Sequence, residues 1–197
     1  MMAEMHDGFG STLLTAQMQL DSGAMTAADA AAVLRECMDD LRLMVDAQEP
    51  SVGDPGTLLG MLRYRLQRRI QAAGVRLHWR MDDLPPHGEL DPARSLDLLR
   101  LLQEAISNAL RHSAARDIEI GLRQRGPQIE IVVADNGAGF DASGRRGRGI
   151  DGMHARAQRL GAVLTLDSAT GAGTRVTLLL PPPAPAPAGA AAQGEEP

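Results

Sequence analysis

The chain has 197 residues and a formal charge of −5, because 25 acidic residues outnumber 20 basic ones. Every basic residue is an arginine, and the absence of lysine excludes a Walker A phosphate loop and Schiff-base chemistry. The acidic balance and the 2% of aromatic residues argue against direct nucleic-acid binding, which needs a basic groove with stacking aromatics.

The chain contains one cysteine, Cys37, which cannot form an internal disulfide and so indicates no oxidising compartment. It has no apolar run long enough to span a membrane and no recognisable signal peptide. We therefore expect a soluble cytoplasmic chain, with the possibility of a longer parent protein tethered to a membrane.

Residues 1–49 are predicted to form a helical hairpin. Apolar residues recur at three- and four-residue steps on both sides of a break at Asp21-Ser22-Gly23, a pattern typical of two amphipathic helices. Two short helices cannot bury such stripes alone, so we expect a homodimer whose two hairpins form a four-helix bundle. Residues 50–56 contain two prolines and two glycines and are predicted to be a linker.

Residues 57–183 are predicted to form a compact α/β domain, because helical and alternating apolar patterns follow one another there. Helices are expected at about 58–74, 92–112 and 150–160, and strands at about 75–79, 117–123, 128–135, 163–167 and 175–180. The glycine- and arginine-rich residues 140–149 are predicted to be a mobile loop. The Pro/Ala-rich tail, residues 184–197, is predicted to be disordered.

Glu104, Asn108 and His112 are the first candidate site. Steps of four residues place these three side chains along one face of a helix. A carboxylate, an amide oxygen and an imidazole in a row can position a water molecule or metal ion and a phosphate. The alternative interpretation is an ordinary solvated polar face.

The second candidate site is Asp135-Asn136-Gly137-Ala138-Gly139, at the end of a predicted strand. Asn-Gly is also a strong hairpin signal, but a loop and a helix follow here instead of a partner strand. A terminal carboxylate followed by glycines favours close approach of a ligand to the backbone, with Asp135 accepting a hydrogen bond from an amino group.

The third candidate site is Gly147-Arg148-Gly149-Ile150-Asp151-Gly152, which opens a predicted helix with G-x-G-x-x-G spacing. With Asp167 about 20 residues further on, it imitates a dinucleotide-binding fingerprint, and this is the alternative interpretation. That fingerprint must directly follow a strand, whereas the residues before Gly147 have no strand pattern. A glycine-rich loop at a helix N-terminus still favours phosphate binding.

The fourth candidate is the pair His6-Asp7, beside the apolar stripe of the first predicted helix. Gly8 and Gly10 follow, each costing about 1 kcal/mol relative to alanine inside a helix, which a purely structural helix has little reason to carry. If Asp7 accepts one imidazole N–H, the other nitrogen of His6 is left as a nucleophile. The alternative is a pair of ordinary exposed polar residues.

Taken in order, these motifs resemble a sensor histidine kinase over nearly the whole chain apart from the tail. Met5-His6-Asp7-Gly8-Phe9-Gly10 resembles the phosphoacceptor motif of the subfamily related to nitrate sensors. Residues 104–112 resemble the family's N box, residues 135–139 its G1 box, and residues 147–153 with 171–174 its G2 region. The resemblance implies an α+β chain: a dimerising two-helix hairpin followed by an α/β sandwich of the gyrase, chaperone, kinase and mismatch-repair (GHKL) ATPase type.

The resemblance also implies a role for each matching residue around bound ATP. Asn108 would ligate Mg²⁺, Glu104 would orient water or polarise the site, and Arg111 and His112 would approach the phosphates. Asp135 would bond the adenine amino group. The remaining matches would admit the base (Gly137, Gly139), hinge a lid over the triphosphate (Gly147, Gly149, Gly152) and lie near the base (Thr174).

For the helical hairpin, the resemblance implies that His6 attacks the γ-phosphorus of ATP, with Asp7 as hydrogen-bond acceptor or base. The function then expected is a homodimeric, ATP- and Mg²⁺-dependent kinase that passes the phosphoryl group to an aspartate of a response regulator with a helix-turn-helix output domain. Two alternatives stay open: a GHKL serine kinase of the anti-sigma-factor type, and a non-catalytic dimerisation module that binds nucleotide. Ser11 stands where the subfamily often has Gln or His, residues thought to help dephosphorylate the regulator, so the resemblance leaves phosphatase activity open.

Overall fold

The computed structural model describes residues 13–31, 33–34, 37–38, 53–82, 84, 90–112, 114–142 and 147–182. The chain divides into two compact units, Met1–Gln48 and Glu49–Pro197. His6, Asp7 and the tail 184–197 lie outside the described residues, so the predictions made for them are not tested by the structure.

In the first unit, residues 13–21 and 27–31 are helical, and residues 22–26 between them form a turn where the sequence predicts a break. Thr26 begins the second helix: its backbone N–H and its hydroxyl donate to the Asp29 carboxylate (3.2 and 2.6 Å), and the Asp29 N–H donates back to the Thr26 hydroxyl (3.2 Å). This reciprocal cap fixes where the helix starts. Gly23 has φ +71°, the left-handed conformation that favours glycine in a turn.

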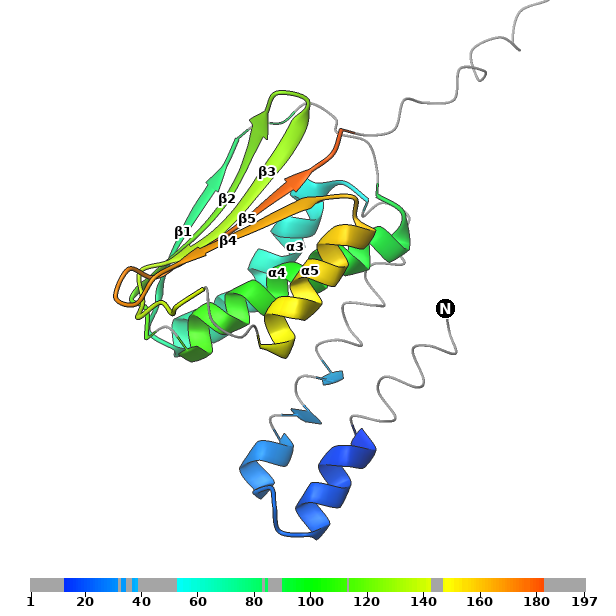
Figure 1. Ribbon diagram of the computed structural model, residues 1–197, viewed down its shortest axis with the longest axis vertical. Coiled ribbons are helices and arrows are strands. Elements are labelled where there is room, and N and C mark those ends of the chain that lie inside the picture. The colour runs from blue at the N-terminus through cyan, green and yellow to red at the C-terminus, as the bar shows by residue number, and fades with distance from the viewer. Residues whose placement is uncertain are drawn as a thin grey trace, which may run out of the picture. The chain divides into compact units, whose positions relative to one another are not determined.

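The second unit is a five-stranded sheet with three helices packed on one face (Figure 1). The strand order is β1-β2-β3-β5-β4, with β1 parallel to β2 and the other neighbours antiparallel. The elements are, in chain order, α3 (Pro55–Ala72), β1 (Arg76–Met81), α4 (Pro92–His112), β2 (Asp117–Arg125), β3 (Gln128–Asp135), α5 (Arg148–Arg159), β4 (Val163–Ser168) and β5 (Thr174–Leu180). The predicted α/β sandwich is confirmed.

The topology also decides against the dinucleotide-binding alternative. A dinucleotide fold needs a mostly parallel sheet and a glycine-rich turn directly after a strand. Here three of the four strand pairings are antiparallel, and α5 follows a loop rather than a strand. The G-x-G-x-x-G spacing therefore does not mark a dinucleotide site, although it does open a helix as predicted.

Two aspartates followed by proline start the long helices of this unit. The Asp91 carboxylate accepts the Arg94 N–H (2.9 Å), which caps α4 at the predicted position. The Asp54 carboxylate accepts the Thr57 N–H (2.8 Å) in the same way, so α3 begins at Pro55. The helix therefore includes the last two residues of the predicted linker 50–56, because the Asp-Pro pair acts as a helix start rather than as a chain breaker.

The core lies between the sheet and the helices. Alternate residues of the central strands face the helices and are buried, as the two-residue period of a strand requires. The most buried large side chains are Leu58, Leu59, Leu62, Leu98, Leu99, Leu101, Leu102, Ile106, Ile118, Ile120, Ile129 and Ile131. The opposite face of the sheet is mixed: it carries the buried Val132 and Glu130, the one buried acid among the described residues, which is paired with Arg123 and Arg125.

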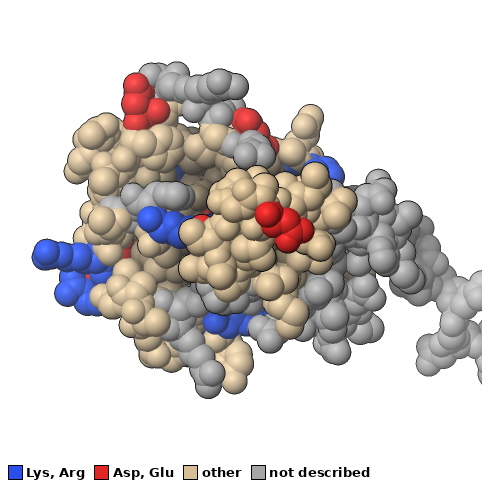
Figure 2. Space-filling view, turned by 90° about the horizontal axis from the view of Figure 1, so that it is seen from below, with Lys and Arg blue, Asp and Glu red and all other residues tan. Residues whose placement is uncertain are grey.

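Surface charge is distributed in small groups. Among the described residues visible on the face drawn in Figure 2, arginine groups are separated by uncharged surface and by acidic residues.

Candidate functional site

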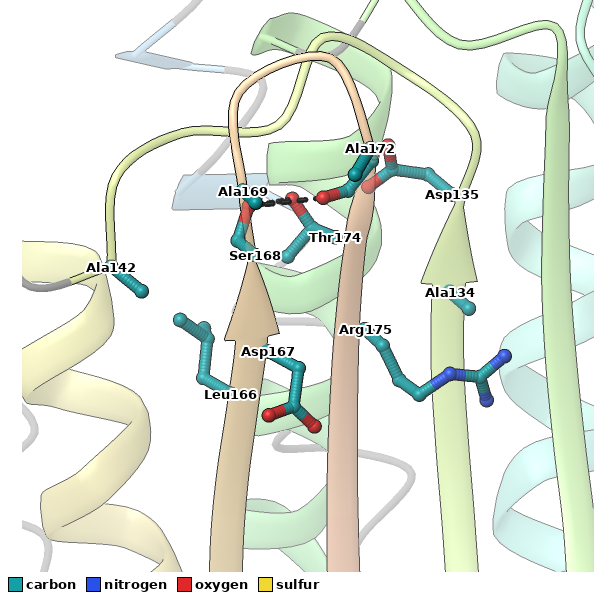
Figure 3. A pocket seen from close by; sticks show the side chains of 11 residues that line it. Ala134, Asp135, Ala142, Leu166, Asp167, Ser168, Ala169, Ala172, Thr174 and Arg175 are labelled. Atoms are coloured by element: carbon teal, nitrogen blue, oxygen red, sulfur yellow. Dashed lines mark hydrogen bonds between the residues drawn. The ribbon is translucent and has the colours of Figure 1, made fainter.

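A cavity lies where strands β3, β4 and β5 end together (Figure 3). Its volume is about 510 Å³, within the range of small-molecule sites. It is lined by Ala134, Asp135, Ala142, Leu166, Asp167, Ser168, Ala169, Ala172, Gly173, Thr174 and Arg175. Asp135 and Thr174, which were predicted from distant sequence motifs to lie near one base, are neighbours in the β3–β5 register and both line this cavity.

Two loops beside the cavity are in close backbone contact. A Cβ added to Gly139 would lie 2.1 Å from the carbonyl oxygen of Ala169, and one added to Gly173 would lie 2.1 Å from the carbonyl oxygen of Asp135. Both glycines also have positive φ, +57° and +75°. Only glycine fits either position, because a side chain would collide with main-chain atoms that cannot rotate away.

Ser168 connects the same two loops through its hydroxyl. It accepts the Phe140 N–H (2.9 Å), donates to the carbonyl oxygen of Gly173 (3.0 Å) and lies 3.0 Å from the Thr174 hydroxyl. Asp135 is held from its own side, since one of its carboxylate oxygens accepts the Gly137 N–H (2.8 Å). Three polar side chains that line the cavity, those of Asp135, Ser168 and Thr174, are therefore preorganised by hydrogen bonds.

Glu104 on α4 lies directly against the start of α5. A Cβ added to Gly149 would lie 2.2 Å from a carboxylate oxygen of Glu104. The structure thus brings the N-box glutamate and the G2 glycine together, although they are 45 positions apart in the numbering. Gly149 is helical and is not among the glycines with positive φ, so its role here is to leave room for a carboxylate rather than to supply unusual backbone freedom.

The other predicted residues occupy the same two helices. Asn108 lies one helical turn beyond Glu104 on α4 and is half-buried, and Arg111 is exposed near the end of that helix. His112 is the last residue of α4, but its side chain lies outside the described residues. Gly147 precedes α5 in an extended conformation (φ −81°, ψ 162°), and Gly152 lies within α5 against the Arg156 side chain.

The far end of α5 is anchored to α4 by charge. The Arg159 guanidinium donates two hydrogen bonds to the Asp97 carboxylate (2.8 and 2.5 Å), an arrangement that raises the pKa of Arg159. Arg94 donates to the carbonyl oxygen of Leu160 (2.8 Å) at the C-terminal end of α5. The helix is thereby fixed at its C-terminal end, whereas its N-terminal end carries the glycines and approaches Glu104.

The donor chemistry near Asn108 fits Mg²⁺ bound together with phosphates. Mg²⁺ takes hard oxygen ligands and commonly keeps only one or two from the protein, with phosphate oxygens and water completing its shell. Asn108 offers one amide oxygen, and the described part of the chain holds no cluster of three or more His, Cys, Asp or Glu residues that would form a cage of its own. The Asn108 amide oxygen is thus compatible with the role of Mg²⁺ ligand that the resemblance implies for it.

Three features of the site were not predicted. Ser168, the Asp97–Arg159 pair and the contacts of Asn136 all depend on which strands and helices become neighbours. Ser168 directly follows a predicted strand, so its place at the end of that strand could be predicted from the sequence. Its hydrogen-bonding partners could not, because Phe140 comes from the loop after β3, and Gly173 and Thr174 lie just before and at the start of β5.

The geometry and the sequence together define an ATPase-type domain. Residues 93–184 match the family described as "Histidine kinase-, DNA gyrase B-, and HSP90-like ATPase". Over this range the chain is similar to that family, and its relatives include proteins named as signal transduction histidine-protein kinases.

Among these relatives, the chain is 27% identical over 192 residues to the signal transduction histidine-protein kinase/phosphatase UhpB of Salmonella typhimurium, covering 90% of this chain and 37% of that protein. It is 28% identical over 136 residues to the corresponding kinase/phosphatase DegS of Bacillus subtilis, covering 66% of this chain and 35% of that protein. The chain thus spans little more than a third of the length of these relatives.

Solved structures show the same fold. The Acinetobacter baumannii histidine kinase AdeS superposes with a TM-score of 0.59 at 16% identity, over 89% of this chain and 97% of that one. The histidine kinase domain of the Erythrobacter litoralis EL346 blue-light activated kinase gives 0.56 at 16% identity, over 90% and 94%. No helix in the described part of this chain is both long and apolar enough to cross a membrane.

Proposed function

We propose that the chain is the kinase core of a two-component sensor histidine kinase of the nitrate-sensor-like subfamily. It binds ATP with Mg²⁺, phosphorylates itself on His6 and transfers the phosphoryl group to an aspartate of a response regulator with a helix-turn-helix output domain. The observation that carries the proposal is the meeting of Asp135 and Thr174 in one cavity, and a second contact, between Gly149 at the start of α5 and Glu104, agrees with it.

In this proposal the second unit binds and orients the nucleotide. The Asp135 carboxylate accepts a hydrogen bond from the adenine amino group, and the Thr174 hydroxyl lies beside the base. Gly137 and Gly139 leave the backbone open for the ring to approach. Gly147, Gly149 and Gly152 form the lid at the start of α5, whose free N–H groups favour phosphate.

The chemical step joins the two units. A nitrogen of His6 attacks the γ-phosphorus, a P–N bond forms, and the bond to the oxygen of the ADP leaving group breaks. Asp7 accepts the imidazole N–H, while Glu104 polarises the site, and Arg111 with His112 approaches the phosphates. Mg²⁺, held through Asn108, supplies neutralisation of phosphate charge when bound. Positioning and charge neutralisation are the main sources of catalysis in phosphoryl transfer.

Exposed apolar side chains of the first unit support a homodimer. Leu14, Met18, Leu34 and Met38 are 58%, 65%, 55% and 50% exposed in the single chain. Large apolar side chains gathered on two short helical segments are unfavourable in water, and a second copy of the unit would cover them in a four-helix bundle. The proposed reaction uses cellular ATP and therefore places this part of the protein in the cytoplasm.

Incubation with γ-labelled ATP and Mg²⁺ tests the proposal. We expect label on the chain that is lost in acid and retained in alkali, as for a phosphohistidine, and that moves to an added receiver domain. His6→Gln should carry no label while its thermal unfolding stays unchanged. Label that persists in His6→Gln would contradict the assignment of His6.

The same experiment separates the two alternatives. A serine kinase of the anti-sigma-factor type would give acid-stable label on a partner protein. A non-catalytic dimerisation module would bind nucleotide without labelling any protein. The presence of both Glu104 and Asn108 favours a catalytic site over such a module.

A further inference from the structure

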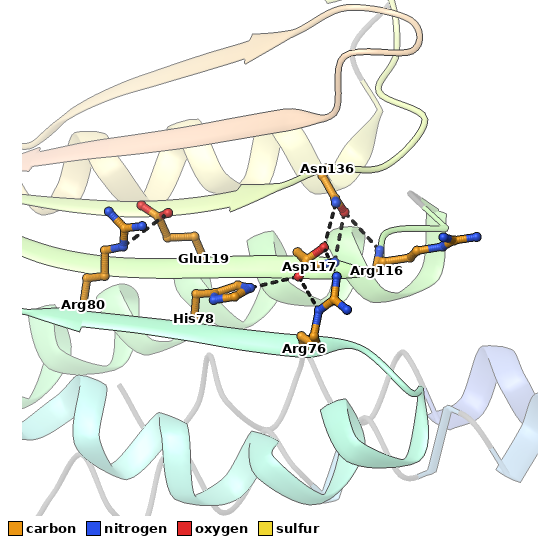
Figure 4. A network of polar contacts seen from close by, with 7 residues as sticks. All are labelled: Arg76, His78, Arg80, Arg116, Asp117, Glu119 and Asn136. Carbon is orange, nitrogen blue, oxygen red and sulfur yellow. Dashed lines mark hydrogen bonds and ion pairs between the residues drawn. The ribbon is translucent and has the colours of Figure 1, made fainter.

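Asn136 ties the end of β3 to the start of β2 through four hydrogen bonds (Figure 4). Its side-chain oxygen accepts the backbone N–H groups of Arg116 (3.0 Å) and Asp117 (2.9 Å). Its side-chain nitrogen donates to the Asp117 carboxylate (2.9 Å), and its own backbone N–H donates to the Asp117 carbonyl oxygen (3.3 Å). All the hydrogen-bonding groups of this side chain point at one neighbouring strand.

The Asp117 carboxylate at the centre of this network is itself held in place. It accepts two hydrogen bonds from Arg76 (2.7 and 2.9 Å) and lies 2.9 Å from a ring nitrogen of His78. These hydrogen bonds hold the pKa of Asp117 well below the usual carboxyl range, so the group is anionic at any pH near neutrality. Asn136 is therefore attached to a charged, oriented acceptor rather than to a mobile side chain.

The network bears on the cavity because Asn136 directly follows Asp135. One Asp135 carboxylate oxygen accepts the Gly137 N–H, so the orientation of that carboxylate depends on the backbone of residues 135–137. Asn136 lies in the middle of this segment and fixes it to β2. On the other side, Gly173 packs against the Asp135 carbonyl group. The backbone around Asp135 is thus held from both directions.

We propose that Asn136, supported by Asp117, is a positioning residue that aligns the Asp135 carboxylate for recognition of the amino group of a 6-aminopurine. This inference rests on the proposed nucleotide site. It assigns base selectivity to a side chain that lines no part of the cavity, and it gives the polar cluster on β1 and β2 a function beyond joining two strands.

The test compares two nucleotides that differ at the purine edge Asp135 is proposed to read, at the position 6 substituent and the adjoining N1. ATP carries an amino group at position 6 of the purine, and ITP carries a carbonyl oxygen there. We expect Asn136→Ala to weaken Mg·ATP binding about tenfold in a calorimetric titration, as for loss of one aligned hydrogen bond to a charged group, and to leave Mg·ITP binding unchanged. A double variant with Asp135→Ala should lose no more ATP affinity than Asp135→Ala alone.

A control and a rescue sharpen the result. Arg80→Ala removes a neighbouring ion pair, Arg80 to Glu119 (3.6 Å), that has no bond to the segment 135–137, and it should change neither affinity. Asn136→Asp places two carboxylates together and should lower ATP affinity, and adding Asp117→Asn restores one donor and one acceptor and should recover part of the loss.

If Asn136→Ala weakened the binding of ATP and ITP equally, Asn136 would hold the two strands together without favouring either base, and the inference would be overturned. Unchanged affinity of Asn136→Ala for both ATP and ITP would overturn it as well. If the unsubstituted chain bound neither nucleotide, the proposed function itself would fail, and this inference with it.

Discussion

The substitution Gly149→Ala, at the start of α5, separates the structural role of that helix from its proposed role in catalysis. Alanine is favoured over glycine in a helix by about 1 kcal/mol, and by less near the first turn, so helix propensity alone predicts equal or slightly higher stability. The added Cβ, however, would lie 2.2 Å from a Glu104 oxygen, which must retreat by at least about 1 Å to reach normal van der Waals separation. Because the Glu104 side chain is flexible, it can move aside, and the free energy of unfolding should fall only slightly.

The displacement should instead appear in the reaction. A misplacement of about 1 Å at a reacting centre can lower a rate about 100-fold, and we expect a loss of that order in the rate of self-phosphorylation. The melting temperature should shift by no more than about 3 °C. Gly60→Ala is the matched control, because Gly60 lies in α3 with nothing within 4 Å of an added Cβ, and it should raise stability without changing the rate.

Single-turnover labelling and thermal unfolding of both variants provide the measurement. A Gly149→Ala protein with the unsubstituted rate would refute the assigned proximity of Glu104 to the reaction. A Gly149→Ala protein that fails to fold would contradict the argument that the Glu104 side chain can move aside.

Three further predictions concern other parts of the same unit. Asn108→Ala should abolish Mg²⁺-dependent ATP turnover while circular dichroism stays unchanged; retained turnover would remove this amide from the site. Gly139→Ala should lose at least about 2 kcal/mol of unfolding free energy, measured in urea, because it adds a backbone collision to the roughly 1–2 kcal/mol cost of its positive φ. Gly126 also has positive φ, but nothing lies within 4 Å of an added Cβ, so Gly126→Ala should lose only the free energy that the positive φ costs. Equal losses in the two variants would contradict the backbone collision at Gly139. Asp97→Asn should lower the melting temperature by about 2–4 °C by weakening the pair with Arg159, and no shift would show that this pair does not anchor α5.

The elements of the second unit were predictable because their signals are local. Asp91-Pro92 capped α4 where expected, and the strand 128–135 was predicted with its observed ends. The start of α3 was missed for a local reason as well: Asp54-Pro55 was taken as part of a linker, although the same residue pair starts α4.

The site was predictable only in part, because its residues come from separate elements. The order of motifs indicated that Asp135 and Thr174 serve one ligand, and the β3–β5 pairing places them side by side. Periodicity carries no information about which strand becomes the neighbour of β3, so the bonds made by Asn136 and Ser168 had no signal in the sequence. The closeness of Gly149 to Glu104 was hidden for the same reason.

The distinction between glycines is the main change that the structure brings. The sequence interpretation treated Gly147, Gly149 and Gly152 together as hinges of a lid. In the structure, Gly149 leaves space for the Glu104 carboxylate, whereas Gly139 and Gly173, where two loops meet beside the cavity, have positive φ.

The central claim is that a nucleotide binds at the end of β3. Equilibrium titration of the chain with Mg·ATP, in parallel with Asp135→Ala, measures this without requiring the phosphoacceptor segment to function. We predict saturable one-to-one binding by the unsubstituted chain and a loss of at least tenfold in affinity for Asp135→Ala at unchanged melting temperature. Absence of binding, or equal affinity in the two proteins, would contradict the account.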